Sequence, residues 1–220
     1  WLSREIWFSG IFTVLIVVAA LLIYFKPSAK SATDALTILA AIVGLVDIWA
    51  MAAVYTSSSV PVWQHSSVYI EFYVAAITMG AAIFLALSFK EALKIKMTTV
   101  LVVGIAVMFQ VVAMLLYYIQ MGASASLAVQ QSLALLSGMS GLLSLKWFLI
   151  LLGVGLLFFS GQKASLKVAG GQAAIETAAT AEGALGFNLY AVAAALLVIG
   201  QLAGRYVFYA SAIVSTLGLS

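Results

Sequence analysis

The amino-acid sequence predicts an all-α integral membrane protein, a bundle of about six transmembrane helices. Of its 220 residues, 65% are hydrophobic and only 8% are charged, whereas soluble domains carry about 25% charged residues. Six apolar stretches approach or exceed the roughly 17–25 residues that a helix needs to cross a bilayer. They lie at about 5–25, 34–54, 68–89, 97–119, 144–160 and 187–213. We expect them to form a single transmembrane domain over residues 1–220.

The first two linkers are short and polar. Lys26 and Lys30 lie between the first and second spans, and the linker 55–67 indicates a tight turn around Pro61. Trp63 in this turn suits the level of the lipid headgroups, where tryptophan is enriched. These residues are therefore expected to lie at the membrane surface.

The later linkers are longer. The linker 120–143 contains two adjacent glutamines and a Leu-rich stretch, which favour a helix lying in the membrane interface. The Ala- and Gly-rich linker 161–186, with Glu176 and Glu182, predicts a surface helix or a mobile loop. Between these linkers, the fifth span at 144–160 is the shortest.

The basic residues fix the expected orientation. Alternate linkers hold seven of the ten basic residues, whereas linkers 55–67 and 120–143 hold none. The seven are Lys26, Lys30, Lys90, Lys94, Lys96, Lys163 and Lys167. The positive-inside rule assigns their side to the cytoplasm, so both ends of the chain are expected to face outward. Anchoring at the membrane surface explains the net charge of +3 without a nucleic-acid partner.

Two residue counts exclude common redox sites within this chain. It has no cysteine, so it cannot ligate an iron–sulfur cluster or a zinc ion through cysteine. Its single histidine, His65, cannot form the histidine pair that holds haem in membrane cytochromes b. We expect no haem and no metal site, and His65 in its polar linker is more typical of a solvated residue than of a ligand.

Ionisable side chains inside apolar runs are the main functional signal, because such residues are rare in membranes and usually functional. They are Glu5, Asp47, Glu71 and Arg205. At 1.5 Å per residue, Asp47 lies roughly 20 Å, Gln201 roughly 21 Å and Arg205 roughly 27 Å across a core of about 30 Å. Gln110 lies at about the depth of Asp47. All of these groups fall in the predicted outer half.

Several of these groups also have an ordinary structural interpretation. Arg205, near a helix end, could extend its side chain to the interface. Glu5 and Glu71 could be solvated or stabilised by a helix N-terminus. Gly200 and Gly204 form a small-xxx-small pair that is more typical of close helix packing than of ligand contact. Asp47 lies deepest and is the hardest to explain structurally, which favours proton handling or pairing.

Together, the outer polar groups suit a quinol headgroup. Oxidation of a quinol by two electrons releases two protons and therefore needs acceptors that relay protons to water. The apolar quinol tail would enter from the lipid. The same cluster could instead line an ion path or bind a partner subunit.

Four short motifs occur in order across essentially the whole chain. They are Leu2-Ser3-Arg4-Glu5-Ile6, Val54-Tyr55 with Val60-Pro61-Val62-Trp63, Val129-Gln130-Gln131-Ser132 and Gly204-Arg205-Tyr206-Val207-Phe208-Tyr209. With these motifs in register, the chain resembles the membrane anchor subunit of dimethyl sulfoxide reductase-type molybdoenzymes. That family usually has eight spans with both ends outside, and this chain resembles the last six. We expect the first spans to lie upstream of Trp1.

The resemblance implies a three-part complex in a prokaryotic cytoplasmic membrane. A molybdopterin catalytic subunit and a four-cluster iron–sulfur subunit would dock on the outer face, and the anchor would oxidise menaquinol without haem. Glu5 matches the acidic position of the first motif, and Arg205 matches the arginine of the last. The family's quinol-site histidine belongs to a segment upstream of the Glu5 motif, so His65 receives only a secondary role.

The leading hypothesis is an anchor that takes electrons from menaquinol near the outer face and passes them to the iron–sulfur subunit. Glu5 would accept a proton, with Asp47 as a second relay, and Arg205 would position the headgroup or keep the carboxylates ionised. Glu71 and Gln201 complete the candidate site with His65. The alternatives are a purely structural anchor and an ion-translocating subunit, although the predicted inner half lacks the polar groups that translocation requires.

Overall fold

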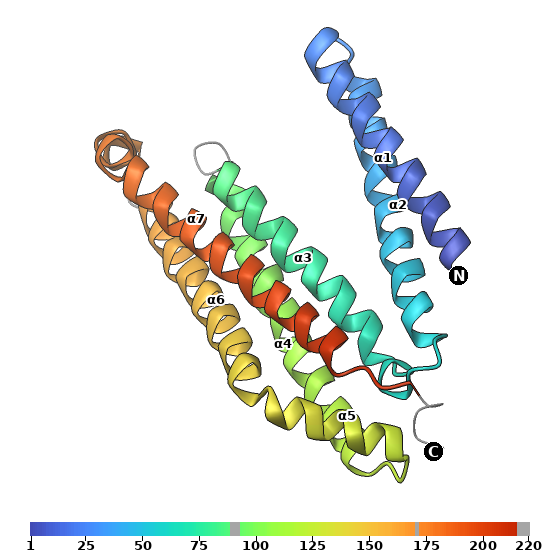
Figure 1. The fold of residues 1–220 in the computed structure, drawn as a ribbon. Helices are drawn as coiled ribbons and strands as arrows, with labels where there is room; N and C mark the ends of the chain where they lie inside the picture. Colours follow the sequence, from blue (N-terminus) through green and yellow to red (C-terminus); the bar gives the residue numbers. More distant parts are fainter. Residues whose placement is uncertain (89–92, 170–171, 215–220) are drawn as a thin grey trace. The chain divides into compact units, whose positions relative to one another are not determined.

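The computed structural model describes residues 1–88, 93–169 and 172–214, with side chains for all of these except 93–96 and 163–188. The described residues form seven α-helices and one short 3₁₀-helix, and no strand occurs among them, which confirms the all-α prediction. The elements are α1 (Leu2–Phe25), α2 (Lys30–Thr56), η1 (Pro61–Trp63), α3 (Ser67–Leu87), α4 (Leu93–Gly122), α5 (Leu127–Gly138), α6 (Ser140–Ala169) and α7 (Gln172–Ala210) (Figure 1).

Six helices are long and apolar enough to cross a membrane, and they correspond to the six predicted spans. The apolar segments are Leu2–Phe25, Lys30–Thr56, Ser67–Leu87, Met97–Gly122, Ser140–Gln162 and Leu189–Ala210. The fifth begins four residues before the predicted limit, because the helix includes the small residues Ser140 and Gly141. The protein is a multi-pass membrane protein.

The predicted helix in the linker 120–143 is present as α5. Its buried residues Ala128, Val129, Ser132 and Leu136 recur at helical spacing and therefore share one face, and α5 contacts α4 and α6. In the linker 161–186, α6 continues to Ala169 and α7 begins at Gln172. The side chains of Glu176 and Glu182 in this linker lie outside the described part of the structure. The same holds for the side chains of Lys90, Lys94, Lys96, Lys163 and Lys167.

The chain packs into two compact units. Unit 1 contains Trp1–Tyr73, and unit 2 contains Val74–Ile213. The expectation of a single transmembrane domain over 1–220 stays a prediction.

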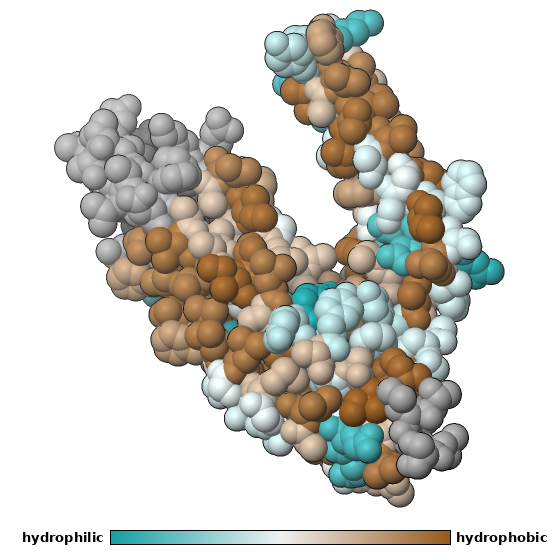
Figure 2. All heavy atoms as spheres, in the orientation of Figure 1, coloured by the Kyte–Doolittle hydropathy of each residue, from teal (hydrophilic) through white to brown (hydrophobic). Residues whose placement is uncertain are grey.

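In unit 1, α1 and α2 form a helical hairpin. The less exposed residues of α1 recur every three or four positions and form one stripe along the helix. They are Glu5, Phe8, Ser9, Phe12, Leu15, Ala19 and Leu22. A Cβ atom on Gly44 would lie 3.0 Å from the Phe12 ring, so the glycine makes room for this ring between the helices. Elsewhere α1 exposes large apolar side chains, as lipid contact requires (Figure 2).

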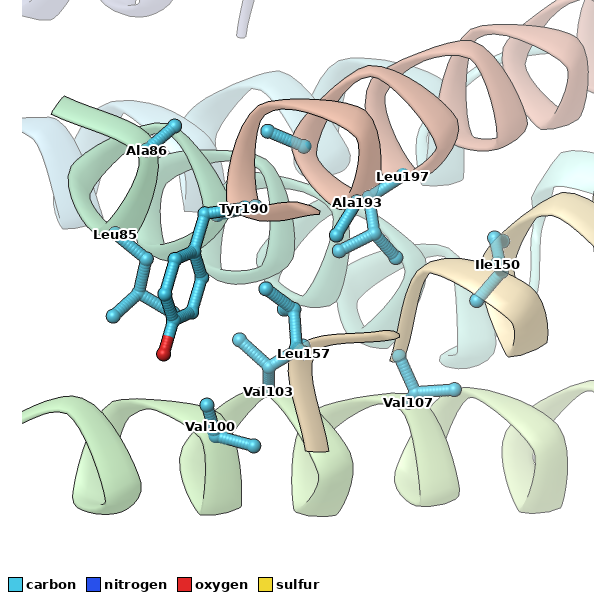
Figure 3. Packing of buried hydrophobic residues seen from close by; sticks show 12 residues of the cluster. Leu85, Ala86, Val100, Val103, Val107, Ile150, Leu157, Tyr190, Ala193 and Leu197 are labelled. Carbon is cyan, nitrogen blue, oxygen red and sulfur yellow. The ribbon is translucent and has the colours of Figure 1, made fainter. Parts of the chain in front are cut away.

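In unit 2, the remainder of α3 packs with α4, α6 and α7 around an apolar cluster (Figure 3). Its largest fully buried members include Leu85, Leu157 and Leu197. Helices α6 and α7 approach closely at Gly200. A Cβ atom on this glycine would lie only 3.2 Å from the Lys146 carbonyl oxygen. The sequence interpretation of Gly200 as a packing residue therefore agrees with the structure. The polar residues Gln201 and Arg205 follow Gly200 on α7 and therefore lie next to this close contact.

Candidate functional site

Asp47 lies in the contact between α1 and α2. The Ser9 hydroxyl donates a hydrogen bond to its carboxylate, at 2.9 Å from Oδ1 and 2.8 Å from Oδ2. Both side chains are half-buried. A carboxylate inside a membrane span needs such a donor, because lipid offers none. Ser9 was not among the sequence candidates, since a serine in an apolar run is common and the pairing of two spans cannot be read from either one.

Glu5 lies one helical turn before Ser9, in the same stripe of α1. Aromatic contacts hold this first turn on α2: the Trp1 and Trp49 rings pack edge-on with centroids 4.9 Å apart. The Arg4 guanidinium lies 4.8 Å from the centroid of the Trp1 ring. Glu5 is half-buried while Arg4 is exposed. Glu5 and Ser9 therefore share the stripe of α1, and Ser9 joins this stripe to Asp47 of α2.

His65 and Glu71 lie at the start of α3, also in unit 1. The His65 Nδ1 accepts a hydrogen bond from the Ser67 backbone N–H at 3.0 Å, and it lies 2.7 Å from the Ser67 hydroxyl oxygen. The imidazole therefore satisfies a backbone donor at the helix N-terminus, as a capping residue does. Glu71, one turn into α3, is half-buried. The Tyr73 hydroxyl donates to the Leu45 carbonyl at 2.8 Å and so holds α3 on α2.

Unit 2 contains a buried polar layer that joins three helices. Gln110 of α4 and Gln201 of α7 exchange two amide hydrogen bonds, each of 3.2 Å. Gln201 also donates to the Thr78 hydroxyl oxygen at 3.1 Å, and Thr78 in turn donates to the Val74 carbonyl at 2.7 Å. The exposed fractions of Gln110 and Gln201 are 0% and 3%. The Gln201 amide is thus hydrogen-bonded to side chains of α3 and α4, which indicates that it holds these helices together.

Lys146 is a buried cation that the sequence interpretation overlooked. Its exposed fraction is 4%, and its ammonium lies 5.0 Å from the centroid of the Trp147 ring. A Cβ atom on Gly204 would lie 2.8 Å from the Lys146 Cε, so the absent side chain of Gly204 leaves room for the lysine. The signal was visible in the sequence, because Lys146 lies within the fifth apolar stretch. Arg205 follows Gly204 on α7 and is half-buried.

Within each unit, these polar groups lie toward one end of the helices. In unit 1 they lie where α1 begins and α2 ends, and in unit 2 where α6 begins and α7 ends. Toward the opposite end of unit 2, the described interior is mainly the apolar cluster, which includes Leu85, Val100 and Leu157. In the described part of the chain, no group of three or more histidine, cysteine or acidic side chains could hold a metal ion.

The chain was also compared with known protein families. The sequence model of the DMSO reductase anchor subunit (DmsC) matches residues 1–211. The chain belongs to this family. The protein is accordingly a DmsC-family membrane anchor of a DMSO reductase-type oxidoreductase complex. No match was found among curated proteins or among solved structures.

Proposed function

We propose that this DmsC-family anchor oxidises menaquinol beside Glu5 and Asp47 of the α1–α2 hairpin, and that an adjacent iron–sulfur subunit receives the electrons. The observation that carries the proposal is Asp47 held by Ser9 between α1 and α2, one turn from Glu5. Two carboxylates at one end of a membrane hairpin are suitable acceptors for the protons of a quinol.

The chemistry divides between subunits. Conversion of menaquinol to menaquinone releases two protons and two electrons. Glu5 and Asp47 supply carboxylates for the protons, whereas this cysteine-free chain offers no ligands for an iron–sulfur cluster. The electrons would therefore pass one at a time to a cluster in the partner subunit and then to the molybdopterin subunit. Both partners would dock at the outward helix ends, in a prokaryotic cytoplasmic membrane.

Arg205 and the buried Lys146 belong to unit 2, so the role of Arg205 at the quinol headgroup rests on the resemblance of its motif to the family. His65 and Gln201 receive weaker support as quinol contacts, because His65 binds the start of α3 and Gln201 belongs to the buried amide layer. Glu71 remains a candidate through its half-buried position on α3.

Ion translocation is less well supported than quinol oxidation. A translocating subunit needs polar groups through the full membrane thickness. Below the layer of Gln110 and Gln201, the described interior of unit 2 is filled mainly by Leu85, Leu157 and their apolar neighbours. A purely structural anchor is the remaining alternative, and it predicts that no quinol analogue changes the signal of the nearest iron–sulfur cluster.

The test compares two electron donors in the purified complex. Glu5→Gln should slow turnover with a menaquinol analogue at least about tenfold, because general acid–base groups contribute roughly 10²–10⁴ in rate. Turnover with a reduced dye, which delivers electrons directly to the partner subunits, should be unchanged. Asp34→Asn is the matched control, since Asp34 is an exposed carboxylate near the other end of α2. Wild-type quinol turnover in Glu5→Gln would remove Glu5 from the mechanism.

A further inference from the structure

Ser9 lies next to Asp47 and one helical turn from Glu5 in the α1–α2 hairpin. Its hydroxyl lies within 2.9 Å of both Asp47 oxygens, so one donated hydrogen is shared between them. Among the described residues, Ser9 is the hydrogen-bond partner of Asp47. Glu5 lies four residues before Ser9, on the same face of α1.

The register of the hairpin places these groups in order along its axis. Phe12 lies against Gly44, and Ser9 lies against Asp47. A step of three residues back along α1 therefore corresponds to a step of three residues forward along the antiparallel α2. One more turn places Glu5 at the level of Met51. Glu5 therefore lies about 6 Å closer than Ser9 to the end of the hairpin at which α1 begins.

Helix association alone does not explain an aspartate at this position. An interhelical hydrogen bond in a membrane contributes about 0.6 kcal/mol on average. A charged side chain at the centre of a membrane helix costs about 2.5–3.5 kcal/mol on insertion scales. An uncharged asparagine could accept the Ser9 hydrogen bond without that cost, so the carboxylate needs a further reason.

We propose that Ser9 connects Asp47 to Glu5 as a proton-exit path, which rests on the proposed quinol oxidation. Asp47 accepts a proton from the quinol and becomes a donor to the Ser9 oxygen. The Ser9 hydrogen, no longer held by the carboxylate, then passes to Glu5 directly or through one water molecule, since residues four apart have Cβ atoms about 5–6 Å apart. The Asp47 proton moves onto the Ser9 oxygen at the same time, which leaves Asp47 ionised again. A hydroxyl can make this exchange because it both donates and accepts. Each cycle moves one proton and returns Ser9 to its starting state.

The test uses the intact complex and a menaquinol analogue. Ser9→Ala should lower quinol kcat about tenfold or more, within the range of general acid–base effects, and should raise the solvent isotope effect because proton exit becomes rate-limiting. Ser9→Thr, which keeps a hydroxyl, should restore both properties. Thr13→Ala is the control, because Thr13 is an exposed hydroxyl of the same helix that binds the Ser9 carbonyl rather than Asp47.

Each result decides a different claim. Normal kcat and isotope effect in Ser9→Ala, together with slow quinol oxidation in Glu5→Gln, would overturn the relay and leave the proposed function standing. Equal losses in Ser9→Ala and Ser9→Thr would assign Ser9 to packing. If Ser9→Ala prevents assembly, Asp47→Asn decides instead, since it keeps an acceptor for Ser9 but cannot carry the proton. Normal quinol turnover in Asp47→Asn would then overturn the relay.

Discussion

Replacement of Gln201 by leucine tests whether the buried amide layer stabilises helix association. Gln201→Leu removes two hydrogen bonds to Gln110, each of 3.2 Å, and one of 3.1 Å to Thr78. At about 0.6 kcal/mol for each interhelical hydrogen bond, their loss amounts to about 2 kcal/mol. The buried Gln110 amide keeps its desolvation cost without its two hydrogen bonds to Gln201, which adds about 1 kcal/mol or more. We expect the free energy of unfolding to fall by about 3 kcal/mol.

The double variant Gln110→Leu/Gln201→Leu should be less destabilised than the sum of the two single variants. Removing both polar partners leaves no unsatisfied amide, and such paired replacements can be nearly neutral. Reversible unfolding of the detergent-solubilised protein, followed by circular dichroism, measures the coupling. Gln131→Leu, at an exposed position of α5, should change stability by less than about 0.5 kcal/mol. Wild-type stability of Gln201→Leu, or strict additivity of the double variant, would refute the reasoning.

Three further predictions concern Gly204, Gly200 and His65. Gly204→Ala should displace the flexible end of Lys146, whose Cε lies 2.8 Å from the added Cβ position, and should cost less stability than the roughly 1–3 kcal/mol of core overpacking, because a flexible side-chain end can move aside. Gly200→Ala, which meets the α6 backbone, should instead cost about 1–3 kcal/mol of stability; the reverse pattern would contradict these assignments. His65→Ala should cost about 1 kcal/mol and increase hydrogen exchange at the Ser67 amide, which loses its acceptor. Unchanged exchange there would mean that His65 does not hold the start of α3.

The helices could be predicted from the sequence because each span is a long apolar run. The limits differ mainly where small or polar residues continue a helix, as at Ser140. Depth counting placed Gln110 and Gln201 at similar levels, and the structure joins them by hydrogen bonds. Depth along a helix follows directly from residue number, so this part of the interpretation needed no knowledge of packing.

Side-chain partners could not be predicted, because they depend on which faces meet. The pairing of Ser9 with Asp47 follows from the register that Phe12 and Gly44 set between α1 and α2. Lys146 was overlooked for a different reason. It lies near the start of a span, where a lysine commonly reaches the interface, and only the packing of α6 on α7 shows that it is buried.

Electron paramagnetic resonance of the intact complex tests the quinol site most directly. The signal measured is that of the iron–sulfur cluster nearest to the anchor, recorded with and without a quinol analogue that cannot be oxidised. If menaquinol is oxidised beside Glu5 and Asp47, the analogue should shift this signal in the wild type, and Glu5→Gln should weaken the shift. A cluster signal that no quinol analogue changes, in a complex that still turns over with reduced dye, would contradict quinol oxidation by this anchor.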